Sequence, residues 1–296
     1  LLPEMYLISN STLKHLRITF SFNLLPIFLF AVAITPQSIN WIETLVLFVC
    51  WHLLIYPASN GFNSYFDKDK ESIAGIKYPP KVTKELYYFS IALDGIGVLL
   101  ALCIDLPTAI SMLIYGLISK AYSHPSIRLK KRPMVSWIVV SVFQGYFVFL
   151  VTYWAIHDIP IWRLTTSMIQ IPALLTTMML MSAYPITQVY QHNEDRERGD
   201  LTLSLRLGIL GTFHFTALGF IITALGYVSY FFYYQDSQTM LLYLILMIPL
   251  FIYYIFWYQK VRKRIDTADY DHTMKLNRLS ALCLNAFFLL LIIFNA

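Results

Sequence analysis

The sequence predicts an all-α integral membrane protein with nine transmembrane helices arranged around a central cavity, forming two related four-helix halves plus one helix. Of the 296 residues, 57% are hydrophobic and 13% are charged, which argues against a soluble globular enzyme. The hydrophobic residues are collected in runs long enough to cross a bilayer as helices. Because no linker-like or low-complexity tract divides the chain, we expect residues 1–296 to form a single polytopic membrane domain.

Nine apolar runs mark the predicted spans, in chain order 18–36, 42–66, 85–104, 107–123, 135–156, 164–190, 209–233, 239–258 and 279–295. Pro57 in the second span and Pro185 in the sixth are expected to kink their helices, and matching kinks would open a central chamber. Asp94 lies in the middle of the third span. A carboxylate at that depth is either functional or buried against a polar partner, such as His52 or a tyrosine hydroxyl, and both interpretations stay open.

The connections between the spans alternate in charge. Four of them are polar and basic, namely 67–84, 124–134, 191–208 and 259–278. The other four are short, namely 37–41, 105–106, 157–163 and 234–238, and Arg163 is the one basic residue among them. The positive-inside rule therefore predicts that the N-terminus and the four basic connections are cytoplasmic. In a soluble protein the net charge of +5 would suggest nucleic acid, but this distribution indicates membrane topology, and we expect no nucleic-acid partner.

Two segments at the inner ends of the second and sixth spans concentrate acidic residues, namely Asp67, Asp69, Glu71, Glu194, Asp195, Glu197 and Asp200. Asn63, Asp67 and Glu71 are spaced by four, so on a continuing helix they would share one face, and Gln191 and Asp195 repeat that spacing. Oxygen donors without cysteine or paired histidine favour Mg²⁺, which completes its coordination with water and phosphate oxygens. The pair of segments therefore predicts a diphosphate held through bridging metal ions.

Two simpler interpretations accompany this one. The acidic residues could be solvated loop charges paired with neighbouring lysines and arginines. His192, beside the second segment, could act as a base, although we favour a solvated loop residue. A third cytoplasmic segment, residues 122–133, packs Arg128, Lys130, Lys131 and Arg132 beside Tyr122, and the loop before the third span adds Lys77, Lys81 and Lys84. These basic groups could neutralise a departing diphosphate. The positive-inside rule by itself also predicts basic loops, so the role of these residues in neutralising a diphosphate stays open.

These segments resemble the UbiA superfamily of intramembrane prenyltransferases. The first family motif, Asn-Asp-x-x-Asp-x-x-x-Asp, is approximated by residues 63–71, Asn-Ser-Tyr-Phe-Asp-Lys-Asp-Lys-Glu. The second, Asp-x-x-x-Asp followed by Gly and Thr, is approximated by residues 191–202, Gln-His-Asn-Glu-Asp-Arg-Glu-Arg-Gly-Asp-Leu-Thr. The family's Tyr-Ser-x-Pro-Pro-x-x-Leu-Lys stretch is similar to residues 122–130. The similarity extends over nearly the whole chain.

The resemblance implies roles for individual residues. It implies Mg²⁺–diphosphate binding by Asn63, Asp67, Glu71, Gln191 and Asp195. It implies diphosphate contacts by Lys77, Lys81, Ser123, Arg128 and Lys130, and catalytic roles for Asp67, Asp195 and Tyr122. Three positions depart from the motifs: Ser64 and Glu71 each replace an Asp, and Gln191 stands where the second motif begins with Asp. The charge lost at Gln191 predicts weaker Mg²⁺ binding or a substitute ligand such as Asp69 or Glu194.

The activity implied by the resemblance is a Mg²⁺-dependent transfer of a prenyl group from a polyprenyl diphosphate to a lipophilic acceptor, aromatic or a quinone precursor. It would take place in the lipid bilayer of a bacterial or archaeal cytoplasmic membrane. Aromatic residues make up 16% of the chain and could line the path of an allylic cation. A terpene cyclase that uses no acceptor is an alternative. A non-enzymatic transporter is a weaker one, because transporter sites lie near mid-depth and these acidic segments lie at helix ends.

Overall fold

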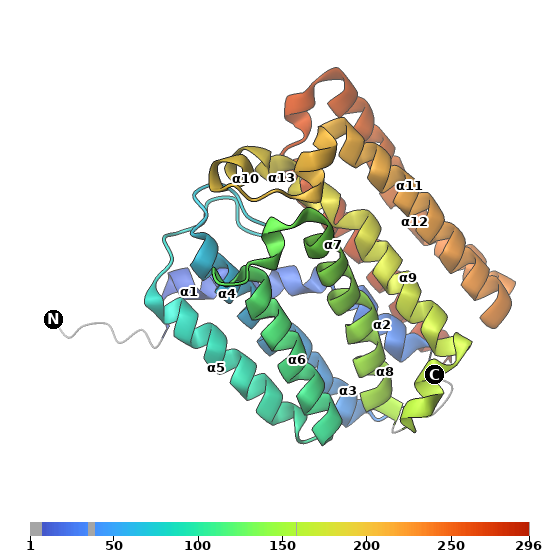
Figure 1. Cartoon of the computed structure of the whole chain (residues 1–296). Coiled ribbons are helices and arrows are strands. Elements are labelled where there is room, and N and C mark those ends of the chain that lie inside the picture. Colours follow the sequence, from blue (N-terminus) through green and yellow to red (C-terminus); the bar gives the residue numbers. More distant parts are fainter. Residues whose placement is uncertain (1–7, 35–38, 158, 296) are drawn as a thin grey trace. The chain divides into compact units, whose positions relative to one another are not determined.

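The computed structural model describes residues 8–34, 39–157 and 159–295, and these residues form helices joined by connections of varied length (Figure 1). Within those ranges no β-strand forms, and Ile73 and Ile76 pair in an isolated antiparallel bridge. Lipid favours this outcome, because a helix satisfies its own backbone N–H and C=O groups. The all-α prediction is confirmed. The end of the first predicted span and the start of the connection after it, residues 35–38, lie outside the described residues.

Six helical segments in the described part of the chain are long and apolar enough to cross a membrane, or seven if the bent pair Asn10–Asn23 and Leu25–Ala33 is one span. The six are Trp41–Asp67, Pro133–His157, Ser167–Arg198, Leu203–Tyr234, Ser237–Lys263 and Tyr270–Phe294. Helices α5 (Lys84–Ala101) and α6 (Leu106–Ser123) correspond to the third and fourth predicted spans. Each is shorter than any of the six segments above, and α5 carries Asp94 while α6 carries Lys120. The predicted count of nine spans is therefore not confirmed.

The chain divides into two compact units. The first contains the described residues of Leu1–Ser21 together with Leu45–Leu129, and includes α1 (Asn10–Leu16), α4 (Tyr56–Asp67), α5 and α6. The second contains the described residues of Phe22–Thr44 and Lys130–Ala296, and includes α2 (Leu25–Ala33), α7 (Pro133–Ser141), α8 (Val148–His157), α9 (Ser167–Ala183), α10 (His192–Arg198), α11 (Leu203–Tyr234), α12 (Ser237–Lys263) and α13 (Tyr270–Asn295). The chain passes from one unit to the other after Ser21, inside α3 (Trp41–Phe48) and after Leu129. The single domain stays a prediction.

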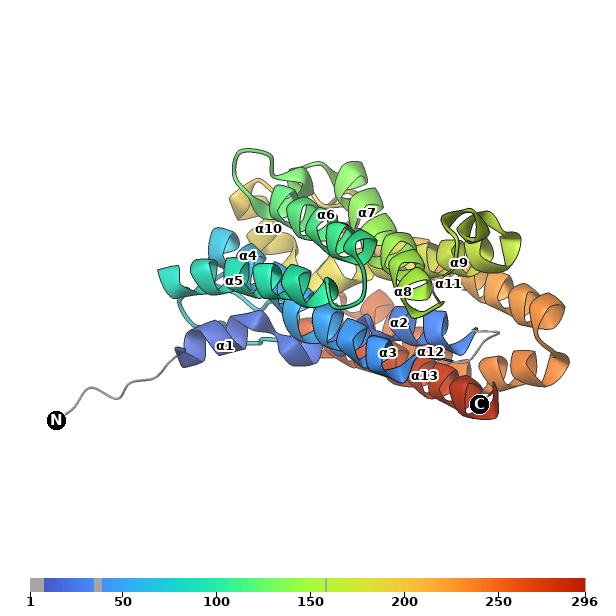
Figure 2. The ribbon, with the colours of Figure 1, turned by 90° about the horizontal axis from the view of Figure 1, so that it is seen from below.

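In the first unit, α4 packs against α5 and α6, and α1 packs against α4 and α5 (Figure 2). A buried cluster at this junction consists of Leu16, Ala58, Leu86 and Leu93. Helices α4 and α5 approach closely at Gly61, where an added Cβ atom would collide with Ser90 Oγ. A larger residue there would push the helices apart. This packing holds the C-terminal end of α4, which carries the first acidic segment, against its neighbours.

In the second unit, α11 packs against both α9 and α12, and α12 packs against α13 (Figure 1). Helix α2 contacts α8 and α13. The interior is aromatic, with fully buried rings at Phe30, Phe149, Tyr227, Phe231, Phe287 and Phe288. Phe30 stacks on Phe288 with ring centroids 4.6 Å apart. This core holds together helices that are distant in the sequence, because Phe30 comes from α2 and Phe288 from α13.

The helical geometry changes near Pro57 and Pro185, the two prolines that are expected to kink their helices. Pro57 lies in the first turn of α4, directly after a π-helical segment at Val49–Ile55. Pro185 begins a 3₁₀ segment, Pro185–Gln191, between α9 and α10. Proline lacks the N–H that would close an α-helical turn, so the backbone widens or tightens at such points. The second acidic segment consequently lies on a short helix of its own, α10.

Candidate active site

The first acidic segment lies at the C-terminal end of α4. Asn63 and Asp67 are one helical turn apart, so their side chains project from one face. Helix α4 ends at Asp67 because Lys68 adopts the left-handed conformation, with φ at 52°, and its N–H donates to Ser64 O at 3.0 Å. The Asp67 side chain is 5% exposed. Its carboxylate is therefore largely shielded from water.

Glu71 does not share the face of Asn63 and Asp67, so the predicted alignment of the three residues is wrong. The chain leaves α4 at Lys68, and Glu71 lies in an exposed bend beyond it. A spacing of four residues aligns side chains only while the helix continues. The predicted role of Glu71 as a ligand beside Asp67 therefore loses its geometric basis.

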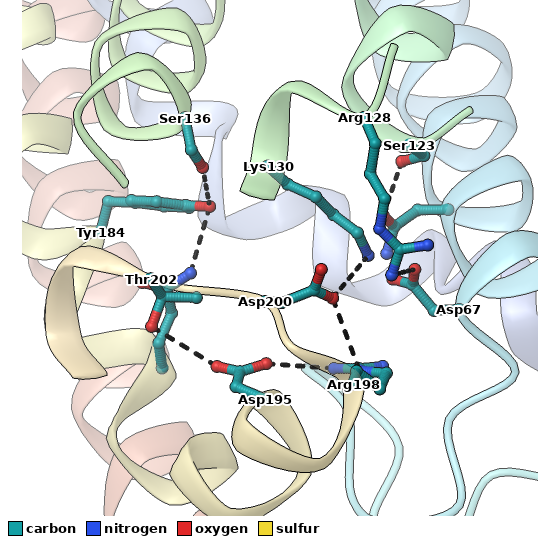
Figure 3. Close-up of polar contacts among 12 residues, drawn as sticks. Asp67, Ser123, Arg128, Lys130, Ser136, Tyr184, Asp195, Arg198, Asp200 and Thr202 are labelled. Atoms are coloured by element: carbon teal, nitrogen blue, oxygen red, sulfur yellow. Dashed lines mark hydrogen bonds and ion pairs between the residues drawn. The ribbon is translucent and has the colours of Figure 1, made fainter. Parts of the chain in front are cut away.

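Ser123 and Arg128 contact the first acidic segment from α6 and the loop after it (Figure 3). Ser123, the last residue of α6, donates its hydroxyl hydrogen to Asn63 Oδ1 at 2.7 Å. Arg128 places Nη2 3.9 Å from Asp67 Oδ1. An amide, a carboxylate, a hydroxyl and a guanidinium thus converge within the first unit. Tyr122, a predicted catalytic residue, is half-buried in the last turn of α6.

Lys77 and Lys81 lie on the loop between α4 and α5, and both residues are exposed. Their backbone carbonyls anchor this loop: Ser72 Oγ donates to Lys77 O and Ser11 Oγ donates to Lys81 O, each at 2.7 Å. The backbone of the loop is thus held in place at these two lysines. A contact between their ammonium groups and a diphosphate stays a prediction.

The second acidic segment occupies α10 and the turn that follows. Gln191 is the residue that caps the start of α10, and Gly199 ends the helix in the left-handed conformation, with φ at 69°. Glycine is favoured there because it has no Cβ to clash. After this turn, the Asp200 N–H donates to Asp195 O at 2.9 Å. The turn therefore brings Asp200 back beside the end of α10.

Arg198 joins the two carboxylates of this segment (Figure 3). Its Nη2 lies 3.1 Å from Asp195 Oδ1, and its Nε lies 3.7 Å from Asp200 Oδ2. Lys130 Nζ lies 3.8 Å from the same Asp200 oxygen. Thr202 Oγ1 donates to Asp195 Oδ2 at 3.5 Å. Two carboxylates and two cations thus form one network, in which Arg198 has the most exposed side chain, at 19%.

His192 is buried, which corrects the expectation of a solvated loop residue. Its Nε2 lies 2.8 Å from Ser204 Oγ, and Ser204 Oγ lies 3.1 Å from Thr212 Oγ1. Gly208 interrupts α11 between them, with φ at 70°, and its carbonyl accepts a hydrogen bond from Thr212 Oγ1 at 2.7 Å. This polar chain ties α10 to the first turns of α11. His192 is thus a structural link in the second unit.

Asp94 pairs with Lys120, so the predicted partners, His52 or a tyrosine hydroxyl, are wrong. The ion pair joins α5 to α6, and the two side chains are only 16% and 15% exposed. Lys120 Nζ also lies 4.8 Å from the centroid of the Phe62 ring. A carboxylate within an apolar helix signals that a partner exists, but only the packing of α5 on α6 identifies it.

The two acidic segments differ in their fitness for a metal ion. Among the residues that the structure describes, no group of three histidine, cysteine, aspartate or glutamate side chains is arranged to hold a metal. The first segment presents an amide and a carboxylate oxygen, which suit a hard cation that keeps water and phosphate ligands. In the second segment both Asp195 oxygens have partners, Arg198 and Thr202. The first segment therefore fits Mg²⁺ better than the second, because Arg198 donates directly to Asp195 at 3.1 Å, whereas Arg128 lies 3.9 Å from Asp67.

The chain matches the model of the UbiA prenyltransferase family over residues 23–279, and it therefore belongs to this family of membrane proteins. No curated protein matches it. Its fold is similar to that of a UbiA homolog from Archaeoglobus fulgidus bound to GPP and Mg²⁺, with a TM-score of 0.64, 18% identity, and coverage of 96% of this chain and 99% of that chain.

Two further solved structures have the same fold. The Archaeoglobus fulgidus homolog bound to DMAPP and Mg²⁺ gives a TM-score of 0.66 at 17% identity, over 96% of this chain and 99% of that chain. A digeranylgeranylglyceryl phosphate synthase gives a TM-score of 0.58 at 18% identity, over 96% of each chain. The chain therefore shares its fold with these three structures.

Proposed function

We propose that this protein transfers a prenyl group from a polyprenyl diphosphate to a lipophilic acceptor within the membrane. The observation that carries the proposal is the convergence of Asn63, Asp67, Ser123 and Arg128 in a chain of the UbiA prenyltransferase family. Amide and carboxylate oxygens suit a hard cation, and a guanidinium suits phosphate oxygens. The four groups together suit a metal–diphosphate headgroup, while the apolar helices suit the prenyl chain.

Mg²⁺ is the metal that this donor set favours, and the Archaeoglobus fulgidus homolog binds it together with GPP or DMAPP. Asn63 and Asp67 would hold the ion, whose charge would stabilise the diphosphate as it leaves. The Asn63 amide oxygen has two lone pairs, so it can accept the Ser123 hydrogen bond and still face a cation. Arg128 would add a fixed positive charge close to Asp67.

The second acidic segment serves the same diphosphate in this proposal. Asp195 and Arg198 come from the connection that follows the sixth predicted span, and Lys130 comes from the one that follows the fourth. Positive-inside topology assigns these connections and the first segment to one side of the membrane, the cytoplasm, together with the N-terminus. The acceptor would be aromatic or a quinone precursor. The central cavity for the prenyl chain stays a prediction.

The test is turnover by the purified protein in lipid nanodiscs with Mg²⁺ and geranylgeranyl diphosphate, with and without aromatic acceptors. We expect release of diphosphate and formation of a prenylated product when the acceptor is present. Asp67→Ala should reduce turnover by about 100-fold or more, because charge stabilisation of the leaving group is lost. Asp266→Ala is the matched control, since this carboxylate has a 72% exposed side chain in the loop after α12.

Other outcomes are informative. Release of diphosphate without an acceptor, together with a cyclic hydrocarbon, would identify the terpene cyclase instead. No release with prenyl diphosphates of any chain length, or equal activity of Asp67→Ala and the wild type, would contradict both enzyme assignments.

A further inference from the structure

Arg198 occupies the position in the second acidic segment where a bridging cation would be expected. Its guanidinium contacts Asp195 Oδ1 at 3.1 Å and Asp200 Oδ2 at 3.7 Å, so one side chain links two carboxylates that would otherwise repel each other. Lys130 approaches Asp200 from a different segment, at 3.8 Å (Figure 3). Arg198 and Lys130 thus neutralise the carboxylates that a metal ion was expected to neutralise.

A metal ion would have to compete with Arg198 and Lys130 for these two carboxylates. The second oxygen of Asp195 accepts a hydrogen bond from Thr202, and the Asp195 and Asp200 side chains are only 7% and 4% exposed. Two carboxylates facing two cations leave no net negative charge among these four groups to attract a divalent ion. Gln191 adds an amide where the family motif has a carboxylate, which lowers the affinity further.

We propose that Arg198, with Lys130, replaces a metal ion at the second acidic segment, so that this protein binds its prenyl diphosphate with one divalent ion, held at Asn63 and Asp67. The inference rests on the proposed function and deepens it. A guanidinium binds phosphate oxygens through paired hydrogen bonds, and Arg198 is partly exposed, so it can contact the diphosphate while it neutralises Asp195. The second segment then contributes charge without coordinating a metal.

The experiment counts the Mn²⁺ ions bound to the full chain in nanodiscs by electron paramagnetic resonance. The chain is saturated with geranylgeranyl thiolodiphosphate, whose C–S bond resists ionisation. We expect one Mn²⁺ per wild-type chain, a loss of this ion in Asp67→Asn, and an unchanged count in Asp195→Asn. The double variant Gln191→Asp, Arg198→Gln should gain a second ion, because a carboxylate is added and the competing guanidinium is removed.

The same samples measure the contribution of Arg198 to diphosphate binding. Arg198→Gln should weaken binding of the thiolodiphosphate about tenfold or more, since charged hydrogen bonds to phosphate are lost. Arg196→Gln is the matched control, because Arg196 is an exposed arginine on the same short helix. Retention of the size-exclusion profile and the thermal unfolding midpoint shows that each variant is folded.

Two Mn²⁺ ions in the wild type, or loss of an ion in Asp195→Asn, would overturn the inference. So would an Arg198→Gln variant that binds the thiolodiphosphate as tightly as Arg196→Gln. These outcomes leave the proposed function intact, because turnover of the diphosphate substrate is measured separately. Failure of the wild type to bind the thiolodiphosphate would instead contradict the proposed function.

Discussion

Asn63 depends on Ser123 for its orientation. An amide can rotate to place either its oxygen or its nitrogen next to Ser123. The hydrogen bond that Ser123 Oγ donates at 2.7 Å places the Asn63 oxygen there. Since Mg²⁺ binds oxygen and not the amide nitrogen, this orientation matters for the proposed ligand. The hydroxyl thus influences the metal without touching it.

Ser123→Ala is predicted to raise the Mg²⁺ concentration for half-maximal turnover by about 3- to 10-fold, the effect of one lost hydrogen bond. Turnover at saturating Mg²⁺ should change by less than about twofold, because the lost hydrogen bond weakens Mg²⁺ binding and leaves the loaded site intact. A Mg²⁺ titration of product formation measures both values. Ser126→Ala, in the exposed loop after α6, is the control. A fall in turnover that saturating Mg²⁺ does not restore would show that Ser123 acts in another way.

Helices α5 and α6 are held together by charge as well as by apolar contacts. Asp94 and Lys120 pair inside a mostly apolar environment, where a charge without its partner is costly. The Asp94 carboxylate also lies 3.7 Å from the position that a Cβ on Gly116 would take, which is an ordinary van der Waals distance. The ion pair therefore specifies how these two short helices align.

Asp94→Asn is predicted to lower the free energy of unfolding by about 3 kcal/mol, because Lys120 loses its counter-ion. Lys120→Met should cost a similar amount, and the double variant should cost less than the sum of the two. Unfolding in sodium dodecyl sulfate, followed by circular dichroism, measures all three. Additive effects in the double variant would show that the two residues act independently.

The α7–α8 span approaches α9 at Gly145, and no larger residue fits there. A Cβ on Gly145 would lie 2.8 Å from Thr177 Cα and 2.9 Å from Thr177 N, which are backbone atoms that cannot rotate away. Glycine at this position allows the backbone N–H of Tyr146 to donate to Thr177 Oγ1 at 3.0 Å. The contact between the two spans therefore depends on the missing side chain.

Gly145→Ala is predicted to destabilise the protein by about 1–3 kcal/mol, the usual cost of overpacking. Gly95→Ala is the matched control within α5, because no atom lies within 4 Å of its added Cβ, and it should stabilise that helix by about 0.5–1 kcal/mol. Denaturant titrations of the two variants compare them directly. Equal stability of the two variants would mean that α9 moves away from Gly145 at little cost.

At the scale of the whole molecule, the proposal requires both acidic segments to act on one diphosphate. Asp67 belongs to the first compact unit and Arg198 to the second. Substitutions of two groups that contact one substrate headgroup have non-additive effects on its binding free energy. Substitutions at independent sites have free-energy effects that add within about 0.5 kcal/mol.

A double-mutant cycle of Asp67→Asn and Arg198→Gln is therefore predicted to show a coupling of about 1 kcal/mol or more in kcat/KM for the prenyl diphosphate. The matched cycle of Asp67→Asn with Arg196→Gln should be additive, because Arg196 is exposed. Additivity in both cycles would separate the two segments functionally and contradict the shared diphosphate.

The amino-acid sequence by itself determined the helical membrane architecture, and it marked Ser123 and Arg128 as candidate contacts for a diphosphate. Hydropathy and local motifs suffice for these features, because lipid imposes helices on any long apolar run. The partners of the charged side chains required the tertiary structure.

Glu71 does not share the helical face of Asn63 and Asp67, because Lys68 turns the backbone. Asp94 pairs with Lys120 because α5 packs on α6, and Arg198 contacts Asp200 because Gly199 reverses the chain. Each of these outcomes depends on the direction of the backbone at a helix end or on the contact between two helices. Spacing along a chain determines direction only within an unbroken helix. Hydropathy could therefore predict where the helices lie, but only the folded chain decided which charges meet.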